Sequence, residues 1–223
     1  MVLGLYYMTK GRKSTPEKII KGEGYIFYSP EEVIIAYNEK KVDLHAIIKV
    51  KTWDVVDDAP VFKMIETTVG RVLFNQVVPK EYGYINEVLT KKSLRDIIGK
   101  VLKKTGTAAT AKFLDDIKDL GFKLAFQGGL SFNLNDVIIP AEKEQLIQEG
   151  YNQVDEVMMN YNSGFITFNE RYNQIIDIWT HTNAKLTQWL IKHLSTFNQG
   201  FKRGYKMSDS GANGGKEQIR EVS

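Results

Sequence analysis

The spacing of hydrophobic and polar positions differs between two parts of the chain, and it changes near Pro79. Before that point, the segments 44–53 (LHAIIKVKTW) and 60–74 (PVFKMIETTVGRVLF) are rich in β-branched and aromatic residues. They flank the turn-forming sequence DDAP at 57–60, so the pattern predicts a β-hairpin. The opening segment 1–11 (MVLGLYYMTKG) is also apolar and strand-like. The first third of the chain is therefore expected to be rich in short strands.

One helix is expected among these strands, in the segment 29–41 (SPEEVIIAYNEKK). Ser29 is a suitable N-cap and Pro30 suits the first helical position. Acidic residues follow in the first turn and lysines are expected in the last, so both ends would complement the helix dipole.

Beyond Pro79 the apolar residues recur at helical spacing. A first helix is expected around 94–102 and a second from 108 to 126, ended by the glycines of QGGLSF at 127–132. The sequence NDVIIP at 135–140 is expected to form a short strand. The residues predicted to face the core are Leu94, Ile97, Ile98, Val101 and Leu102 in the first helix, and Phe113, Leu114, Ile117, Leu120 and Leu124 in the second.

From residue 141 onward the apolar residues follow a heptad, the pattern of a coiled coil. The sequence NSG at 162–164 separates two heptad segments, and Thr167 with Glu170 forms a T-x-x-E capping box that starts the second helix. Two such helices joined by a tight turn predict an antiparallel coiled-coil hairpin. Its predicted seam consists of Ile147, Tyr151, Val154, Met158 and Tyr161 in the first helix, and of Phe168, Tyr172, Ile175, Trp179, Thr182, Leu186, Trp189 and His193 in the second.

These patterns together predict an α+β fold in two parts. A small mixed domain of strands and helices would occupy residues 1–140, and a domain built on the helical hairpin would occupy residues 141–223. With 223 residues, of which 43% are hydrophobic, the chain has enough apolar material for a real core.

Composition narrows the classes of function. The 30 Lys+Arg and 27 Asp+Glu leave a formal charge of +3, which excludes a broad basic surface for duplex nucleic acid, so any phosphate contact must be local. Because there is no cysteine and the histidines are only His45, His181 and His193, neither disulfides nor a metal site are expected. No apolar run approaches the ~18 residues that span a bilayer. We expect a cytoplasmic protein without a membrane partner.

Three segments are candidates for binding, and each has an ordinary structural alternative. The terminal sequence SDSGANGGKEQIR at 208–220 could hold an anion on a glycine-rich nest. It lacks the spacing of a P-loop, however, and such a sequence is more often a flexible turn. The segment KKSLRDIIGKVLKK at 91–104 is basic on one side and faces either phosphate or solvent. The hairpin tip at 165–173 is either an interaction site or a solvated helix end.

Four motifs, taken in order, resemble the β′ subunit of bacterial DNA-directed RNA polymerase. They are VLGLYYMT at 2–9, ETTVGRVLFNQVVP at 66–79, ITFNERYNQIIDIWTHTN at 166–183 and MSDSGANGGKEQIR at 207–220. The resemblance implies an internal piece of that subunit, because the family's N-A-D-F-D-G-D motif, bridge helix and trigger loop are absent. It therefore implies no catalytic residue, metal or cofactor in this chain, with Mg²⁺ bound only by the whole polymerase. The isolated chain is expected to be inactive.

The resemblance also implies roles for the two parts. Residues 1–140 would be similar to the pore domain and residues 141–223 to the funnel domain, lining the secondary channel through which nucleoside triphosphates enter. The hairpin would correspond to the rim helices, which dock Gre-type and other coiled-coil regulators. The further partners implied are the β, α, ω and σ subunits, with DNA and RNA reached only through the whole enzyme. The regulator-binding residues implied are Glu170, Arg171, Tyr172 and Asn173.

The substrate-channel residues implied by the resemblance are Arg171, Asn213 and Lys216. Asn213 stands where the family's D-S-G-A-R-G-S has an arginine. An amide cannot supply the charged, bidentate hydrogen bonds that a guanidinium gives a phosphate. Nearby cations such as Lys202 and Lys216 could restore the charge but not at that point. The alternative class of function is a stand-alone coiled-coil interaction module without enzymatic activity.

Overall fold

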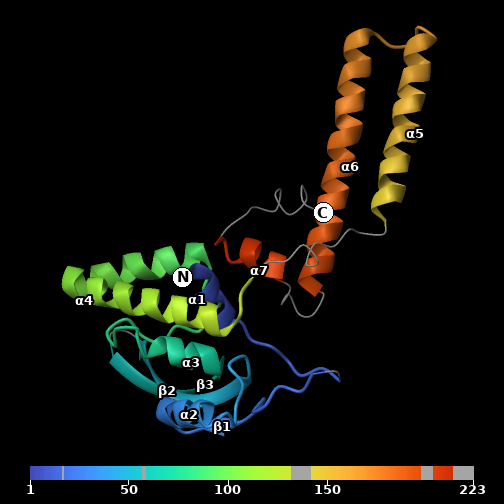
Figure 1. Cartoon of the computed structure of the whole chain (residues 1–223). Helices are drawn as coiled ribbons and strands as arrows, with labels where there is room; N and C mark the ends of the chain where they lie inside the picture. The colour runs from blue at the N-terminus through green and yellow to red at the C-terminus, as the bar shows by residue number, and fades with distance from the viewer. Residues whose placement is uncertain (17, 57–58, 132–141, 197–202, 213–223) are drawn as a thin grey trace. The chain divides into compact units, whose positions relative to one another are not determined.

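The computed structural model describes residues 1–212 apart from residue 17 and the segments 57–58, 132–141 and 197–202 (Figure 1). The chain divides into two compact units. The first comprises Met1–Ser131 with Asp209–Asn213, and the second comprises Phe132–Ser208 with Gly214–Ser223. The domain boundary predicted at residue 140, the strand predicted at 135–140 and the centre of the turn at 57–60 lie outside the described residues.

The first unit contains a three-stranded sheet of order β1-β2-β3. Strand β1 (Ile26–Phe27) pairs in parallel with β2 (Ile47–Val56). Strand β2 pairs antiparallel with β3 (Ala59–Thr68), in a register that sets Ile47 opposite Thr68 and Trp53 opposite Phe62. The predicted hairpin is confirmed.

Helix α2 (Pro30–Asn38) lies where its capping residues predict. The Ser29 hydroxyl accepts a hydrogen bond from the backbone N–H of Glu32 at 3.3 Å, and Pro30 occupies the first turn. The prediction that lysines lie in the last turn is wrong, because the helix ends at Asn38. Lys40 follows with a φ of +57°, in the left-handed region. The N-terminal signal therefore placed this helix better than the C-terminal one.

The strand predicted at 60–74 ends earlier than expected, because Val69–Asn75 form helix α3. The Thr68 hydroxyl caps this helix by accepting a hydrogen bond from the N–H of Arg71 at 3.3 Å. Gly70 allows the close approach of α1, since a Cβ there would lie 1.9 Å from the carbonyl oxygen of Met8. The β-branched composition of this segment does not distinguish a buried helix from a strand.

The opening segment is also a helix, α1 (Val2–Thr9), and the strand-like prediction is wrong. Leu5, Tyr6 and Met8 are buried, so the helix is apolar around most of its circumference. A short apolar run of this kind is ambiguous between strand and helix, and packing decides. At Gly4 a Cβ would lie 2.0 Å from the carbonyl oxygen of Gly121, so α1 contacts α4 backbone to backbone.

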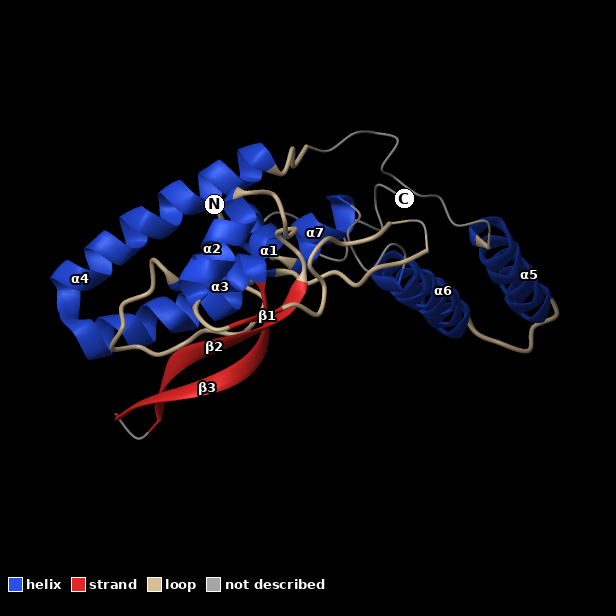
Figure 2. Cartoon of the chain, turned by 90° about the horizontal axis from the view of Figure 1, so that it is seen from below, coloured by secondary structure: helices blue, strands red, loops and turns tan. Residues whose placement is uncertain are grey.

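The two helices predicted after Pro79 are confirmed as the two arms of one bent element, α4 (Lys91–Gln127). Gly106, with φ of +79° and ψ of −179°, breaks the helical geometry between them. Figures 1 and 2 show both arms running back from the bend, and in Figure 2 they diverge from it. Leu102 and Leu114 are exposed, so these two core predictions are wrong, because the buried stripe is narrower than the apolar pattern. The buried residues from the two arms are Leu94, Ile97, Val101, Phe113, Ile117 and Leu124, which share a core with Leu5, Met8 and Phe74.

The second unit contains the predicted helical hairpin, made of α5 (Lys143–Asn162) and α6 (Phe168–Thr196) (Figure 1). Gly150 faces α6 and leaves room for Trp179, whose ring would lie 3.2 Å from a Cβ at that position. The Trp179 ring also meets Tyr151 edge to face, with centroids 5.1 Å apart. Tyr151 is nevertheless more than half exposed, and Val157, outside the predicted seam, is buried instead. A short helix, α7 (Arg203–Asp209), follows and was not predicted.

Within the described residues, none of the helices combines the length and the apolar character that crossing a membrane requires.

Candidate functional site

The hairpin tip is the first candidate site, and its turn is fixed by local hydrogen bonds. Helix α5 ends at Asn162, and Gly164 takes a φ of +75° in the turn. The N–H of Glu170 donates to the Thr167 hydroxyl at 3.3 Å. In return, the N–H and hydroxyl of Thr167 donate to the Glu170 carboxylate at 2.7 Å and 2.8 Å. The predicted capping box is confirmed.

This capping box makes the start of α6 sensitive to acid. The hydrogen bonds from the Thr167 backbone and hydroxyl favour the charged carboxylate and lower the pKa of Glu170. The stabilisation is therefore present above the unfolded-state pKa and is lost as the pH falls through the lower folded-state pKa. We expect α6 to fray at its first turn under acid, and Thr167→Ala to destabilise the hairpin by about 1 kcal/mol at neutral pH. Circular dichroism over an acid titration checks the fraying, and Glu170→Gln should lack the acid transition. Denaturant unfolding at neutral pH measures the effect of Thr167→Ala.

Arg171 is held at the tip by two aromatic rings. Its guanidinium lies 4.4 Å from the ring centroid of Tyr161, on α5, and 4.7 Å from that of Phe168, on α6. Such cation–π contacts contribute about 0.5–1 kcal/mol each at exposed sites. Arg171 therefore joins the two helices, a structural role that neither heptad nor cap predicted.

The outer surface of the tip is aromatic. Phe165 is 80% exposed and Tyr172 is 58% exposed, and Phe168 and Ile176 are exposed beside them. The predicted seam positions Phe168 and Tyr172 are therefore wrong, whereas Arg171 and the predicted seam position Ile175 are less exposed at this end of α6. Residues 168, 172 and 176 are spaced by four, so they form one stripe along the helix. This tip stripe is defined as Phe165, Phe168, Tyr172 and Ile176.

The second candidate site lies at the start of α4, in the first unit. Thr90 and Ser93 form a capping box, in which the Ser93 N–H donates to the Thr90 hydroxyl at 3.2 Å. Lys91 and Lys92 lie in the first turn, which carries no acidic residue, and Arg95 follows in the second turn beside Asp96. Cations at the positive end of a helix dipole are unfavourable for stability. The same arrangement attracts anions.

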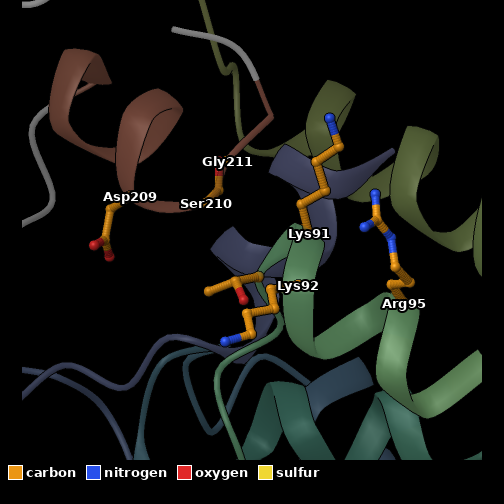
Figure 3. Close-up of a pocket in the computed structure, with 7 residues that line it drawn as sticks. Lys91, Lys92, Arg95, Asp209, Ser210 and Gly211 are labelled. Atoms are coloured by element: carbon orange, nitrogen blue, oxygen red, sulfur yellow. The ribbon is translucent and has the colours of Figure 1, made fainter. Parts of the chain in front are cut away.

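The terminal loop reaches this helix start. The backbone N–H of Lys91 donates to the carbonyl oxygen of Ser210 at 2.8 Å, and Ser210 is fully buried. A cavity of about 330 Å³ opens here, and Figure 3 shows Lys91 and Arg95 extending from the same face of α4 beside it. We call this the basic cavity; its lining residues are Thr90, Lys91, Lys92, Arg95, Asp209, Ser210 and Gly211.

Asp209 is the acidic residue of the basic cavity, and it is engaged by α1. The Tyr6 hydroxyl donates to its carboxylate, and Lys10 Nζ donates to the Tyr6 oxygen at 3.0 Å. Burial lowers the pKa of Lys10, and the charge of Asp209 partly opposes this. The cavity therefore keeps an excess of positive charge at Lys91, Lys92 and Arg95.

The sequence had singled out the basic helix and the glycine-rich loop as separate features, and the structure brings Lys91 and Ser210 together. No spacing rule predicts this contact, because more than 100 residues separate its partners. The predicted channel residues Asn213 and Lys216 lie outside the described residues, and Arg171 lies on the hairpin, away from this loop in sequence. The assignments of Arg171, Asn213 and Lys216 to a channel stay predictions.

Mg²⁺ is expected to bind only in the whole polymerase. The described residues contain no group of three or more His, Cys, Asp or Glu side chains placed to hold a metal ion. The aspartate motif does not occur in the 223 residues. His193 instead stacks on Trp189, with ring centroids 5.0 Å apart.

Comparison with known proteins identifies the family. Residues 1–137 match the family model described as RNA polymerase Rpb1, domain 3, and the chain belongs to this RNA polymerase family. Over its full length it is similar to proteins named DNA-directed RNA polymerase subunit beta′. It is 61% identical to that of Parabacteroides distasonis and 59% identical to those of Bacteroides fragilis and Karelsulcia muelleri. Each comparison covers 100% of this chain but only 15% of the relative. The resemblance inferred from the four motifs is confirmed.

Proposed function

We propose that this chain acts in transcription, as the part of a β′-type subunit that lines the secondary channel for nucleoside triphosphates and docks channel-binding regulators. The polymerase would work in the cytoplasm, with β, α, ω and σ as the other subunits. The chain alone would not polymerise RNA, because the family's metal-binding aspartates are not among its residues. A stand-alone coiled-coil module would explain the hairpin but not the similarity over all 223 residues.

The tip stripe carries the docking part of this proposal. Its aromatic side chains are exposed on a hairpin, whereas a helix that only supports the fold would turn such residues inward. Aromatic anchors of this kind dominate the binding energy of protein interfaces. Glu170 and Asn173 would contribute polar contacts at the margin. Because the Glu170 carboxylate already serves the helix cap, substituting it would confound docking with fraying.

The basic cavity supports the channel part of the proposal. Three cations around one opening raise the local concentration of a polyphosphate and speed its arrival. Lys91 and Arg95, four residues apart on one helix face, can contact the same phosphate chain. Asn213 lies two residues after Gly211, which lines this cavity, and Lys91 and Arg95 would supply the positive charge that the missing family arginine does not.

A charge reversal tests the channel part in the whole polymerase. We expect Lys91→Glu with Arg95→Glu to raise the KM for nucleoside triphosphates roughly three- to tenfold, because local attraction becomes repulsion. The effect should shrink as salt is added. Elongation rates over a range of nucleotide concentrations measure it, and Lys112→Glu with Lys123→Glu, an equal charge change on the other arm of α4, is the control. An unchanged KM at low salt would remove the cavity from the nucleotide route.

A further inference from the structure

Helix α1 fixes the position of Asp209, the acidic residue that lines the basic cavity. The Tyr6 hydroxyl donates a hydrogen bond to the Asp209 carboxylate, and Lys10 Nζ donates to the Tyr6 oxygen at 3.0 Å. The Tyr6 side chain is 1% exposed, so its ring is enclosed by the protein and its hydroxyl has a fixed place. Asp209 itself is exposed, and an exposed carboxylate changes rotamer readily unless a hydrogen bond fixes it.

The same helix fixes the opposite wall of the basic cavity. The hydroxyl of Thr9, buried about one turn after Tyr6, accepts a hydrogen bond from the backbone N–H of Leu89 at 2.9 Å. Leu89 directly precedes Thr90, which caps α4 and lines the cavity. The start of α4 and the Asp209 carboxylate are therefore both tied to α1. Their separation is set by one rigid helix.

The cations of the basic cavity are not compensated by Asp209. Among the described residues, no ion pair joins Lys91, Lys92 or Arg95 to an acidic side chain. Figure 3 shows the Asp209 carboxylate directed away from Lys91 and Arg95. Burial lowers the pKa of Lys10, and the charge of Asp209 acts in the opposite direction and raises it. The carboxylate is thus matched to α1 rather than to α4.

We propose that Tyr6 and Lys10 are positioning residues, which hold the Asp209 carboxylate away from Lys91 and Arg95 and so keep the basic cavity attractive to polyphosphate. Without them, the carboxylate would turn and pair with a cation of α4. That ion pair would neutralise the charge that attracts the ligand, and the carboxylate would repel a phosphate of the same sign. This inference rests on the proposed role of the cavity in the route of nucleoside triphosphates.

A release variant of the whole polymerase, Tyr6→Phe with Lys10→Met, tests this positioning. It removes the hydroxyl and the ammonium but keeps the buried ring and an aliphatic side chain. We expect the KM for nucleoside triphosphates to rise about threefold at low salt with kcat near its normal value, because only the attraction of the ligand is weakened. Adding Asp209→Asn should return the KM to that of the unaltered enzyme, because the amide carries no charge to misplace.

The rescue by Asp209→Asn separates the placement of charge from packing. The triple variant has the same formal charge as the unaltered chain, since it loses one cation and one anion. A KM that stays high after Asp209→Asn would overturn the proposal, because the defect would then lie in packing. An unchanged KM in the release variant would overturn it as well if Lys91→Glu with Arg95→Glu does raise the KM.

Tyr28→Phe with Lys51→Met is the matched control for the release variant. It makes the same two substitutions at exposed positions of the first unit that do not line the basic cavity. The KM should not change. An equal rise in the control would attribute the effect to the substitutions as such and would overturn the proposal.

A structure of the release variant, determined by cryo-electron microscopy of the whole polymerase, tests the geometry independently of nucleotide binding. We expect the Asp209 carboxylate to lie within about 4 Å of Lys91 Nζ or of the Arg95 guanidinium, the distance of an ion pair. A carboxylate that keeps its place beside α1 would overturn the proposal. If the carboxylate moves but charge reversal at Lys91 and Arg95 leaves the KM unchanged, the positioning is supported and the proposed nucleotide route fails instead.

Discussion

Replacing Gly4 by valine is expected to destabilise the first unit by about 3 kcal/mol. Overpacking costs about 1–3 kcal/mol, and the upper value applies because the contacting atoms are backbone atoms that cannot change rotamer. A Cβ at Gly4 would lie 2.0 Å from the carbonyl oxygen of Gly121 and 2.9 Å from the amide nitrogen of Ala125. Both atoms belong to α4, so α1 would have to leave the core that holds Leu5 and Met8. Amide hydrogen exchange of α1 and α4 under increasing urea measures the loss.

Gly99→Ala is the matched control for this prediction. Gly99 lies within the first arm of α4, and nothing lies within 4 Å of a Cβ built there. Alanine should therefore stabilise the helix by about 0.5–1 kcal/mol through its higher helix propensity. If Gly4→Val proves no more harmful than Gly99→Ala, the backbone contact between α1 and α4 is not as described.

Removing the aromatic surface of the tip is expected to weaken regulator binding by about 100-fold, or roughly 2.7 kcal/mol. The change is Phe165→Ser with Tyr172→Ser in the whole polymerase. Both side chains are more than half exposed, so their loss should leave the hairpin folded. The readout is the Kd of a Gre-type transcript-cleavage factor, with basal RNA synthesis measured in parallel and expected to stay near its normal rate.

Phe126→Ser controls for the loss of an exposed aromatic side chain as such. Phe126 lies near the end of α4 and is 88% exposed, but it belongs to the first unit. It should not change the Kd. A double tip variant with normal regulator affinity would refute docking through the tip stripe, and a loss of basal synthesis would mean that the tip supports the enzyme in another way.

Local signals in the sequence predicted the elements that depend on local interactions. Ser29 and the Thr167–Glu170 capping box each place a helix start correctly, because their hydrogen bonds join residues three apart. Segments rich in β-branched and aromatic residues on either side of a turn sequence likewise predicted the hairpin of β2 and β3. The α1 helix was missed because an apolar run has no period of its own, and its backbone contact with Gly121 decides its conformation.

The candidate sites were predicted less completely, because they depend on contacts between distant segments. The tip was located from its turn and cap, but the cation–π contacts of Arg171 with Tyr161 and Phe168 have no sequence signature. The basic cavity forms where the terminal loop contacts the start of α4. The hydrogen bond between Lys91 and Ser210 shows this contact, which the sequence did not predict. The family resemblance identified the class of protein, whereas the contacts of individual side chains became known only from the structure.

Photo-crosslinking in the assembled polymerase tests the central claim most directly. A photoreactive amino acid replaces Tyr172 in the tip stripe and, in a separate control, the exposed Lys192 towards the other end of α6. With a Gre-type factor bound and its cleavage activity confirmed, we predict a cross-link to the factor from position 172 and none from position 192. An active, bound factor that does not cross-link to position 172, or that cross-links equally to position 192, would contradict docking at the hairpin tip.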